Sequence, residues 1–322
     1  MDTIIVTGIG GVVGQGIVRN VRATGLPLRI VGINVTAVSA GNHLCDAVYL
    51  VPYAVEPNYI DTVKEIAQNE GAKLIIPSTD HESYYLALYA ENFQIPVAAS
   101  PHHVTGMCLD KYKTYIAFQE HGIPFAPSCL PKDYHHQWGE IIAKPRDGRG
   151  SRGIMISPEA PEKLEDSYLI QPLLKGVEIT STAYVTQSGE LLGTITMKRS
   201  LESGNTTQAE VTFEYNEQVE QLITSMIRVF PFRGSFNVQS IVTSEGVVPF
   251  EINCRISGTN SIRSQFGFKD VEYTLRERLY HETPSRPEVM EGCAIRVMHD
   301  VIYPNMKLGD IRNNQDNHYI YS

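Results

Sequence analysis

Two neighbouring stretches in the second half of the sequence combine side chains that suit metal and phosphate chemistry. Asn237 and Gln239 lie on one expected strand, and Glu251, Asn253 and Arg255 lie at the end of the next. Because side chains alternate between the faces of a strand, each set shares one face, and a hairpin would bring Gln239, Glu251 and Asn253 together. Carboxylate and amide oxygens suit Mg²⁺, and a nearby guanidinium suits a terminal phosphate. A merely polar sheet face is the alternative.

A glycine-rich segment after Lys144 has the composition of a loop that covers phosphates. Glycines alternate there with arginines, so backbone N–H groups and cations can face phosphate oxygens. It is not a Walker loop, because no Gly-Lys-Ser/Thr follows. An exposed basic hairpin is the alternative. The loop positions of interest are Gly148, Gly150, Ser151, Arg152 and Gly153.

The segment from Gln171 to Glu178 joins an extended stretch to a carboxylate. Gln171, Pro172, Leu173 and Leu174 follow an apolar strand pattern, and an extended backbone can offer N–H and C=O groups to a purine edge. The two oxygens of Glu178 can accept from both ribose hydroxyls. A strand–loop–strand with a solvated Glu178 is the alternative.

A glycine turn near the N-terminus supports a competing interpretation. The segment from Gly8 to Gly14 has the spacing G-x-x-G-x-x-G between a strand and a helix, as in nicotinamide-dependent epimerases and reductases. Such enzymes carry an acidic residue after the second strand, where this sequence has Asn34. They also need Tyr-x-x-x-Lys on a helix, and Tyr303 with Lys307 is interrupted by Pro304. Glycines for close strand–helix packing explain the turn equally well.

The rim of the N-terminal unit also carries polar residues. Asp80 and Glu82 follow a short buried strand and could bind an amino group, although Asp80 could equally cap the next helix. Arg263, a little beyond Arg255, could clamp a carboxylate.

The elements that must position these residues fall into two classes. Residues 1–100 alternate apolar strands with helical patterns, which predicts a doubly wound parallel sheet with its binding crevice at the carboxyl ends of the strands. From residue 141 onward, short strands separated by turns predict antiparallel sheets. The expected strands of this second part are Ile141–Lys144, Gly153–Ile156, Tyr168–Gln171, Glu178–Val185, Leu191–Met197, Ser235–Thr243 and Val247–Asn253, with helices over Lys111–His121 and Glu217–Phe230.

Composition narrows the class of protein. The 322 residues are 42% hydrophobic and 20% charged, as in a soluble globular protein, and the net charge of -9 disfavours nucleic-acid binding. We find no apolar run long enough to cross a bilayer and no signal peptide, so we expect no membrane association and a cytoplasmic location. The five cysteines are widely spaced, and we expect reduced thiols.

Taken together, these motifs resemble one family. Lys111, Lys144 with its glycine-rich loop, Glu178, Gln239 and the E-x-N-x-R segment ending at Arg255 occur in the order and spacing of the ATP-grasp superfamily. The branch most similar is that of carbamoyl phosphate synthetase and biotin carboxylase. The resemblance covers essentially the whole chain. It implies a pre-ATP-grasp domain over 1–100, a lid subdomain with its linker helix over 101–175, and a large C-terminal subdomain over 176–322.

The resemblance also implies roles for the residues. Lys111 and Lys144 would contact the α- and β-phosphates beneath the glycine-rich loop. Residues from Gln171 to Leu174 would line the adenine slot, and Glu178 would hold the ribose. Gln239, Glu251 and Asn253 would bind Mg²⁺, with Mn²⁺ as a substitute. Arg255 would hold the transferred phosphoryl group, with Lys198 and Arg199 as further candidates for the γ-phosphate.

The activity implied is that of a carboxylate–amine ligase. ATP would convert a small-molecule carboxylate to an acyl phosphate, which an amine would attack to give an amide, ADP and phosphate. The chain has one ATP-grasp unit, no glutaminase and no biotin carrier, which disfavours carbamoyl phosphate synthesis and biotin carboxylation. The alternatives are an NAD(P)-dependent epimerase or reductase and a non-catalytic nucleotide-binding protein. A homodimer is expected from similar enzymes.

Overall fold

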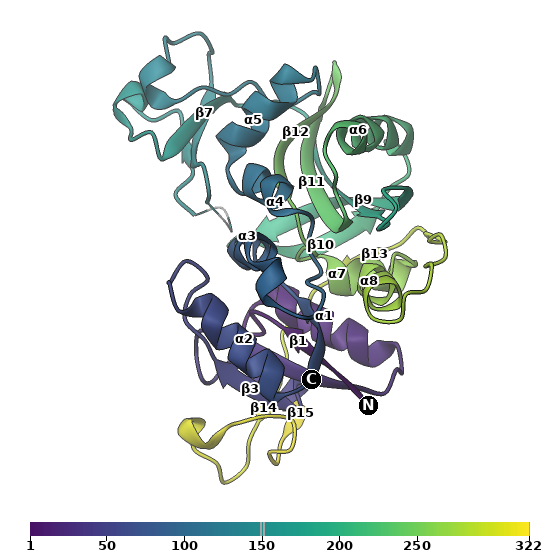
Figure 1. The fold of residues 1–322 in the computed structure, drawn as a ribbon. Coiled ribbons are helices and arrows are strands. Elements are labelled where there is room, and N and C mark those ends of the chain that lie inside the picture. The colour runs from purple at the N-terminus through teal and green to yellow at the C-terminus, as the bar shows by residue number, and fades with distance from the viewer. Residues whose placement is uncertain (149, 151, 322) are drawn as a thin grey trace.

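The apolar runs of the first hundred residues form a parallel sheet that helices cover on both faces (Figure 1). The structure is a computed structural model and describes residues 1–148, 150 and 152–321. Strand order is β3-β2-β1-β4. Ile4 of the central strand packs with α1 on one face, and its neighbour Ile5 packs with α2 on the other. The elements are β1 (Asp2–Val6), α1 (Val12–Ala23), β2 (Leu28–Asn34), β3 (Ala47–Leu50), α2 (Tyr59–Asn69), β4 (Ala72–Ile76) and α3 (Asp80–Leu88).

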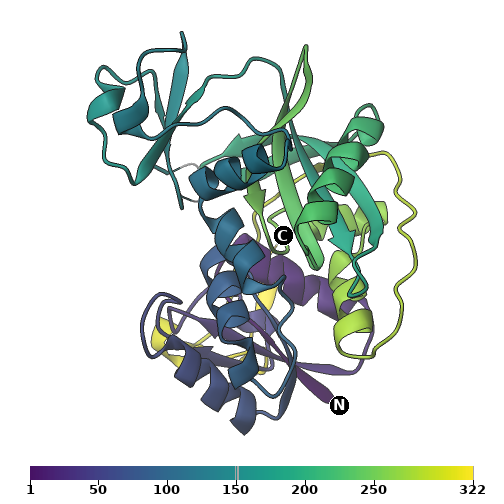
Figure 2. The same cartoon turned by 45° about the horizontal axis from the view of Figure 1, so that its top comes forward.

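Two helices lead from this N-terminal lobe to a small second sheet. Both α4 (His102–Leu109) and α5 (Lys111–Glu120) pack against strand β12 of the large sheet (Figure 2). The small sheet is antiparallel, in the order β6-β5-β7. Its strands are β5 (Ile141–Pro145), β6 (Met155–Ile156) and β7 (Tyr168–Pro172).

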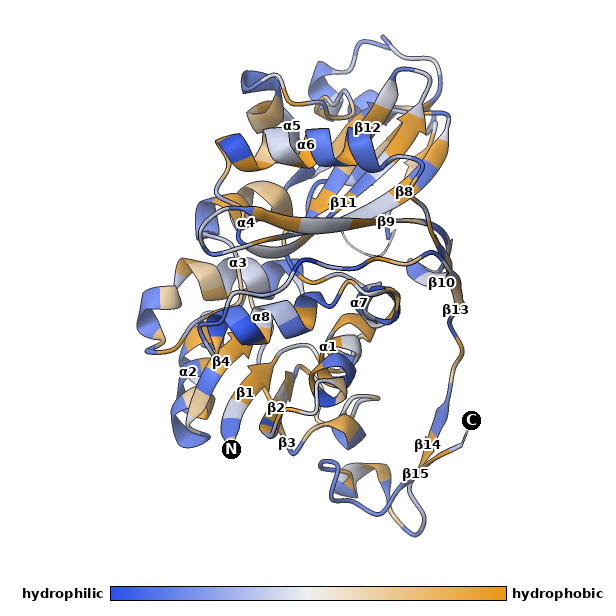
Figure 3. Cartoon of the chain, turned by 90° about the vertical axis from the view of Figure 1, so that its right-hand side faces the viewer, coloured by the Kyte–Doolittle hydropathy of each residue, from blue (hydrophilic) through white to orange (hydrophobic). Residues whose placement is uncertain are grey.

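The third part is a six-stranded antiparallel sheet in the order β12-β11-β8-β9-β10-β13. Helix α6 (Asn216–Val229) covers one face and buries its apolar side, including Leu222 and Met226, while its other side faces solvent (Figure 3). The strands are β8 (Val177–Val185), β9 (Leu191–Glu202), β10 (Asn205–Val211), β11 (Gly234–Thr243), β12 (Gly246–Asn253) and β13 (Cys293–Ile295).

The C-terminal segment returns to the N-terminal lobe. Helices α7 (Asn260–Arg263) and α8 (Asp270–Arg278) pack against α1. After β13 the chain runs down to a two-stranded sheet of β14 (Asp300–Ile302) and β15 (Tyr319–Tyr321) beside the N-terminal lobe (Figure 3). Asn314 binds there to the Cys45 carbonyl at 2.9 Å and to the Asp46 carboxylate at 2.8 Å.

The predicted fold class is confirmed: a parallel N-terminal sheet precedes antiparallel sheets. Three strands were not expected, β3, β10 and β15, because they lie at or near a sheet edge and have polar or exposed positions that weaken the strand pattern. At the edge of the parallel sheet, Val97 makes only a single parallel bridge to Ile75 of β4. No helix in the described part of the chain is both long and apolar enough to cross a membrane.

Candidate active site between the two antiparallel sheets

A cavity of about 290 Å³ lies between the small sheet and the large one. Strands β5 and β7 form one wall, and β8, β9, β11 and β12 form the other. Thirteen of the twenty-one predicted catalytic, nucleotide, metal and substrate residues line this cavity, although they come from segments far apart in the chain. They are Lys111, Lys144, Gly148, Gly150, Arg152, Gln171, Pro172, Leu173, Leu174, Glu178, Arg199, Gln239 and Glu251.

The predicted metal ligands meet on the hairpin of β11 and β12. Gln239 stands directly opposite Glu251 in the strand register. The Gln239 amide donates to the Asn253 side-chain oxygen at 3.1 Å, and the Asn253 amide donates to Glu251 at 3.0 Å. Gln239 and Glu251 line the cavity, and Asn253 lines a narrow extension of it. The hairpin therefore gathers one carboxylate and two amides, as expected from the alternation of side chains along the strands.

Two lysines face this carboxylate from the other wall. The Lys111 ammonium lies 3.7 Å from Glu251 and donates to the Gly148 carbonyl at 2.9 Å. Lys144 donates to the Phe250 carbonyl at 3.3 Å and lies over the Phe250 ring. Burial lowers the pKa of Lys144 to about 7. Burial alone would raise the pKa of Glu251, but Lys111 and Lys144 outweigh it, and the pKa is lowered.

Arg199 connects the two ends of the cavity. Its guanidinium donates to Glu178 at 3.1 Å and to the Gln239 side-chain oxygen at 2.6 Å. Arg199 therefore links the predicted ribose-binding carboxylate to a predicted metal ligand. Leu201 lies two residues further along β9 and lines the same cavity.

Two polar groups of the predicted adenine slot already have hydrogen-bond partners within the protein. The Gln171 amide donates to the Ser128 hydroxyl at 2.8 Å, and the Leu173 N–H donates to the Glu140 carbonyl at 2.9 Å. Pro172 has no N–H to offer. Leu173 and Leu174 therefore contribute mainly apolar surface, together with Ile142, which the sequence analysis did not single out.

The glycine-rich loop forms one edge of the cavity. Gly148, Gly150 and Arg152 line it, whereas Gly153 packs against Pro145 and is absent from the lining. Predicted residue Ser151 lies outside the described residues, as does the neighbouring loop residue Arg149. The turn between β9 and β10 reaches this loop: a Cβ on Gly204 would lie 2.4 Å from the Gly150 carbonyl oxygen.

Contacts of Asp110 hold the glycine-rich loop and Lys111 in place. Asp110 accepts from the N–H groups of Tyr112 and Lys113 and thus caps α5, which begins at Lys111. Its carboxylate also pairs with Arg146, at the start of the glycine-rich loop. Asp110 therefore fixes both segments at once.

Two predicted residues lie elsewhere, and their predicted roles are corrected. Lys198 points to the face of β9 opposite Arg199 and pairs with Glu214 at 2.9 Å, because successive side chains of a strand alternate. Arg263 is fully buried in an ion pair with Asp270, so it cannot clamp a substrate carboxylate.

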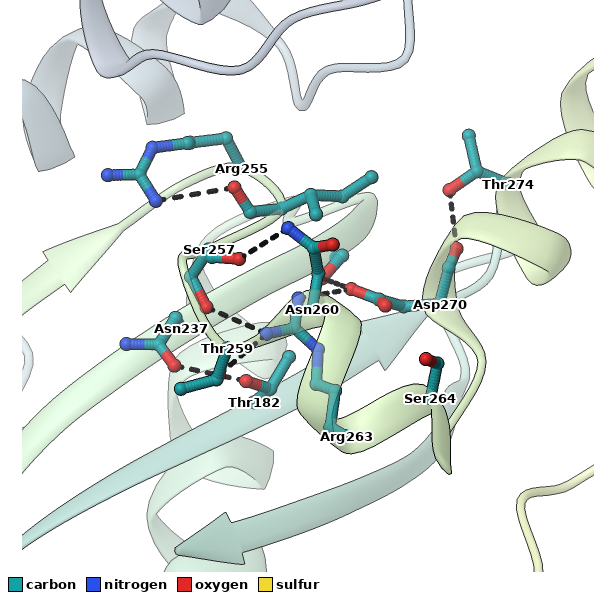
Figure 4. A network of polar contacts seen from close by, with 12 residues as sticks. Thr182, Asn237, Arg255, Ser257, Thr259, Asn260, Arg263, Ser264, Asp270 and Thr274 are labelled. Atoms are coloured by element: carbon teal, nitrogen blue, oxygen red, sulfur yellow. Dashed lines mark hydrogen bonds and ion pairs between the residues drawn. The ribbon is translucent and has the colours of Figure 1, made fainter. Parts of the chain in front are cut away.

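Figure 4 shows the network around Arg263. Its guanidinium also donates to Ser257 and Thr259, and Asn260 donates to the Ser257 carbonyl. These contacts order the turn that follows Arg255. The predicted role of Arg263 in binding is thus replaced by a structural one.

The remaining candidates lie where the N-terminal lobe meets the large sheet. Arg255 pairs with Asp80 at 2.7 Å and does not line the large cavity. Asp80 begins α3, whose N-cap is the neighbouring Thr79. Glu82 is buried and accepts from the hydroxyls of Thr7 and Thr79. Both acids therefore have protein partners, and only Asp80 borders the narrow extension of the site.

Several solved structures of other proteins share this fold. The solved structures that resemble the chain include N5-carboxyaminoimidazole synthetase from Staphylococcus aureus in complex with ADP, with a TM-score of 0.74, 12% identity and coverage of 92% of this chain and 82% of that one. L-amino acid ligase from Bacillus licheniformis has a TM-score of 0.70, 13% identity and coverage of 87% and 74%.

A third similar structure is the biotin carboxylase domain of 2-oxoglutarate carboxylase from Hydrogenobacter thermophilus, in complex with MgADP, ADP and bicarbonate. Its TM-score is 0.68 at 16% identity, covering 88% of this chain and 71% of that one. No curated protein sequence matches the chain. Two family models match it: a PylC-like N-terminal domain over residues 4–98 and an ATP-grasp domain over residues 108–259. The chain therefore contains an ATP-grasp domain preceded by a PylC-like N-terminal domain, and it shares the fold of these solved structures.

Proposed function

We propose that this protein is an ATP-dependent, ADP-forming ligase that activates a carboxylate as an acyl phosphate and joins it to an amine. One observation carries the proposal. Gln239 and Glu251 on paired strands face the same cavity as Lys111 and Lys144, so acidic and amide oxygens stand opposite cations across a space of about 290 Å³. This arrangement suits a triphosphate with a divalent ion.

The nucleotide would lie along the cavity. Its base would pack against Ile142, Leu173 and Leu174, and its ribose would face Glu178. Lys111, Lys144 and the glycine-rich loop would surround the phosphates. Two structures with the same fold support a nucleotide in this protein, because one was solved with ADP and the other with MgADP.

The donor set fits Mg²⁺. Glu251, Asn253 and Gln239 offer one carboxylate and two amide oxygens, the hard ligands that Mg²⁺ prefers, and phosphate oxygens complete its shell. Among the described residues no three His, Cys, Asp or Glu side chains cluster as a metal site, so the phosphates are essential ligands in this proposal. When bound, Mg²⁺ supplies charge neutralisation on the transferring phosphoryl group.

Cationic side chains of the protein would neutralise the remaining negative charge on the phosphates. A carboxylate oxygen attacks the γ-phosphorus, and the bond to the β-phosphate oxygen breaks to release ADP. Lys111, Lys144 and Arg152 face the region where negative charge accumulates. Arg255 pairs with Asp80, which lines the narrow extension of the site, and once released from Asp80 it would hold the acyl phosphate.

A hydroxylamine trap tests the proposal. Hydroxylamine converts acyl phosphates to hydroxamates, so wild-type protein with Mg-ATP and a panel of amino acids and other small carboxylic acids should form a hydroxamate and ADP together. Glu251→Gln should lower this rate at least about 100-fold while leaving the fold intact. Glu245→Gln, in the exposed turn of the same hairpin, is the matched control and should retain full activity.

The competing functions predict different results. A non-catalytic nucleotide-binding protein would be stabilised by Mg-ATP but would form no hydroxamate with any acid. A nicotinamide enzyme would be stabilised by NAD(H) and not by Mg-ATP. Either result would contradict the ligase proposal.

A further inference from the structure

A second cavity, of about 310 Å³, opens at the carboxyl rim of the N-terminal parallel sheet. Gly11 at the start of α1, Asn34 at the end of β2 and His81 in the first turn of α3 form part of its wall. Tyr53 and Val55 come from the loop after β3 and form another part. Such a rim is where open α/β sheets bind ligands.

This rim cavity adjoins the proposed ATP site through shared lining residues. His81 lines both the rim cavity and the narrow extension next to it. The extension is also lined by Lys111, Gly148 and Glu251, all of which line the ATP cavity. A molecule held at the rim therefore lies next to the place where the acyl phosphate would form.

The chemistry of the wall indicates what the rim cavity would hold. None of its lining residues, all within the described part of the chain, is Lys or Arg. Its carboxylate is Glu82, and the side chains of Tyr53 and Val55 add apolar surface that is 56% and 57% exposed. A phosphate would meet a carboxylate there and no cationic side chain, whereas an ammonium or amine on an apolar body would find matching groups.

We propose that the rim cavity is the acceptor subsite for the amine, and that it takes an unphosphorylated amine with an apolar body. This inference rests on the proposed ligase function. It adds the chemical class of the second substrate. It also assigns His81 as the group that takes a proton from the reacting nitrogen.

The coupling step then balances as follows. The nitrogen lone pair attacks the acyl carbon and forms the C–N bond, and the C–O bond to the phosphate breaks with its electron pair leaving on inorganic phosphate. The His81 imidazole takes the proton that the nitrogen loses. No hydrogen bond between described residues engages the ring of His81, which lines both the rim cavity and the narrow extension.

Gly11→Leu blocks the rim cavity. Gly11 has φ −92 and ψ 163, which suit any residue, and an added Cβ would meet only the Gly8 carbonyl, at 3.6 Å. With an acid that gives hydroxamate, phenethylamine, n-butylamine and O-phosphoethanolamine are compared as acceptors. The unphosphorylated amines should couple, and Gly11→Leu should raise their KM at least ten-fold while hydroxamate formation stays unchanged.

Two further variants test the acceptor subsite independently of Gly11→Leu. Tyr53→Ala, at an exposed position, should also raise the amine KM. His81→Gln should lower amide formation roughly 100-fold but spare the hydroxylamine reaction, because hydroxylamine is largely unprotonated near neutral pH. Gly139→Leu, at an open and exposed site in the lid, is the control for Gly11→Leu.

The outcomes separate the two proposals. No hydroxamate with any acid overturns the ligase function itself. Hydroxamate without coupling to any unphosphorylated amine, preference for O-phosphoethanolamine, or coupling that Gly11→Leu leaves unchanged overturns the acceptor subsite alone.

Discussion

Arg199 shows how one side chain can connect two ends of a binding site. It donates to Glu178 and Gln239, and its Nε is buried without a hydrogen-bond partner among the described residues. The next residue back, Lys198, lies on the opposite face of β9. The pair therefore offers a comparison of two neighbouring cations, one inside the cavity and one outside it.

We predict that Arg199→Met weakens ATP binding about 10- to 100-fold, the effect of losing a charged hydrogen bond worth roughly 1.5–3 kcal/mol. Isothermal titration calorimetry measures the change. Lys198→Met is the control and should bind ATP like wild type. Equal losses in the two variants would contradict the placement of Arg199 in the nucleotide site.

Lys144 gives a prediction about pH. Its pKa is about 7, well below that of an ordinary lysine, so the unfolded chain binds more protons between about pH 7 and 10. The cost of burying this ammonium is therefore greatest below pH 7 and declines as the pH rises. A bound triphosphate favours the charged form and raises the pKa again.

ATP binding at pH 8 should accordingly take up a proton at Lys144. The binding enthalpy, measured by calorimetry in buffers of different ionisation enthalpy, should then depend on the buffer. Lys144→Met should remove that dependence. Identical enthalpies in all buffers for the wild-type protein would show that Lys144 does not face the phosphates.

At the scale of elements, the β11–β12 hairpin was predictable because alternation along two strands fixes which side chains meet. The same rule places Lys198 and Arg199 on opposite faces but cannot say which face lines the cavity. Arg263 was not predictable, because its partner Asp270 comes from a helix whose packing depends on α1. The position of His81 in the walls of two cavities was not predictable, because only the assembled lobes bring these walls together.

The start of α5 provides a prediction for an element. Asp110 caps this helix and pairs with Arg146 of the glycine-rich loop, so Asp110→Ala removes both restraints. The cap alone is worth about 1 kcal/mol, and we expect a lower unfolding midpoint and a several-fold higher KM for ATP. Asp61→Ala, in the exposed first turn of α2, should change neither. An unchanged KM for Asp110→Ala would contradict the role of Asp110 in holding the loop.

On the scale of the whole molecule, side chains join the N-terminal lobe to the large sheet at several points. Arg255 pairs with Asp80, and the Asn20 amide donates to the Asn260 carbonyl at 3.1 Å. The C-terminal segment adds contacts at Asn314. The parallel and antiparallel parts were each predictable from their patterns, whereas these contacts between them depend on side chains far apart in the sequence.

Gly16 tests this contact between lobes. A Cβ there would lie 2.2 Å from the Asn260 side-chain oxygen, so Gly16→Ala must displace the buried Asn260 amide or the helix that carries it. We predict a loss of about 1–3 kcal/mol in the free energy of unfolding, measured by urea denaturation, although alanine favours helices. Gly139→Ala, with open space around it, is the control. Stabilisation by Gly16→Ala would contradict the close packing.

The central claim is that Glu251 and its neighbours bind the nucleotide through a metal ion, and titration of ATP with and without Mg²⁺ tests it most directly. For Glu251→Gln we predict a loss of Mg-ATP affinity of at least about 100-fold. Metal-free ATP, measured in excess chelator, should bind this variant as well as or better than wild type, because a negative charge facing the phosphates is gone. A loss of equal size with and without Mg²⁺, or no loss in either condition, would contradict the account.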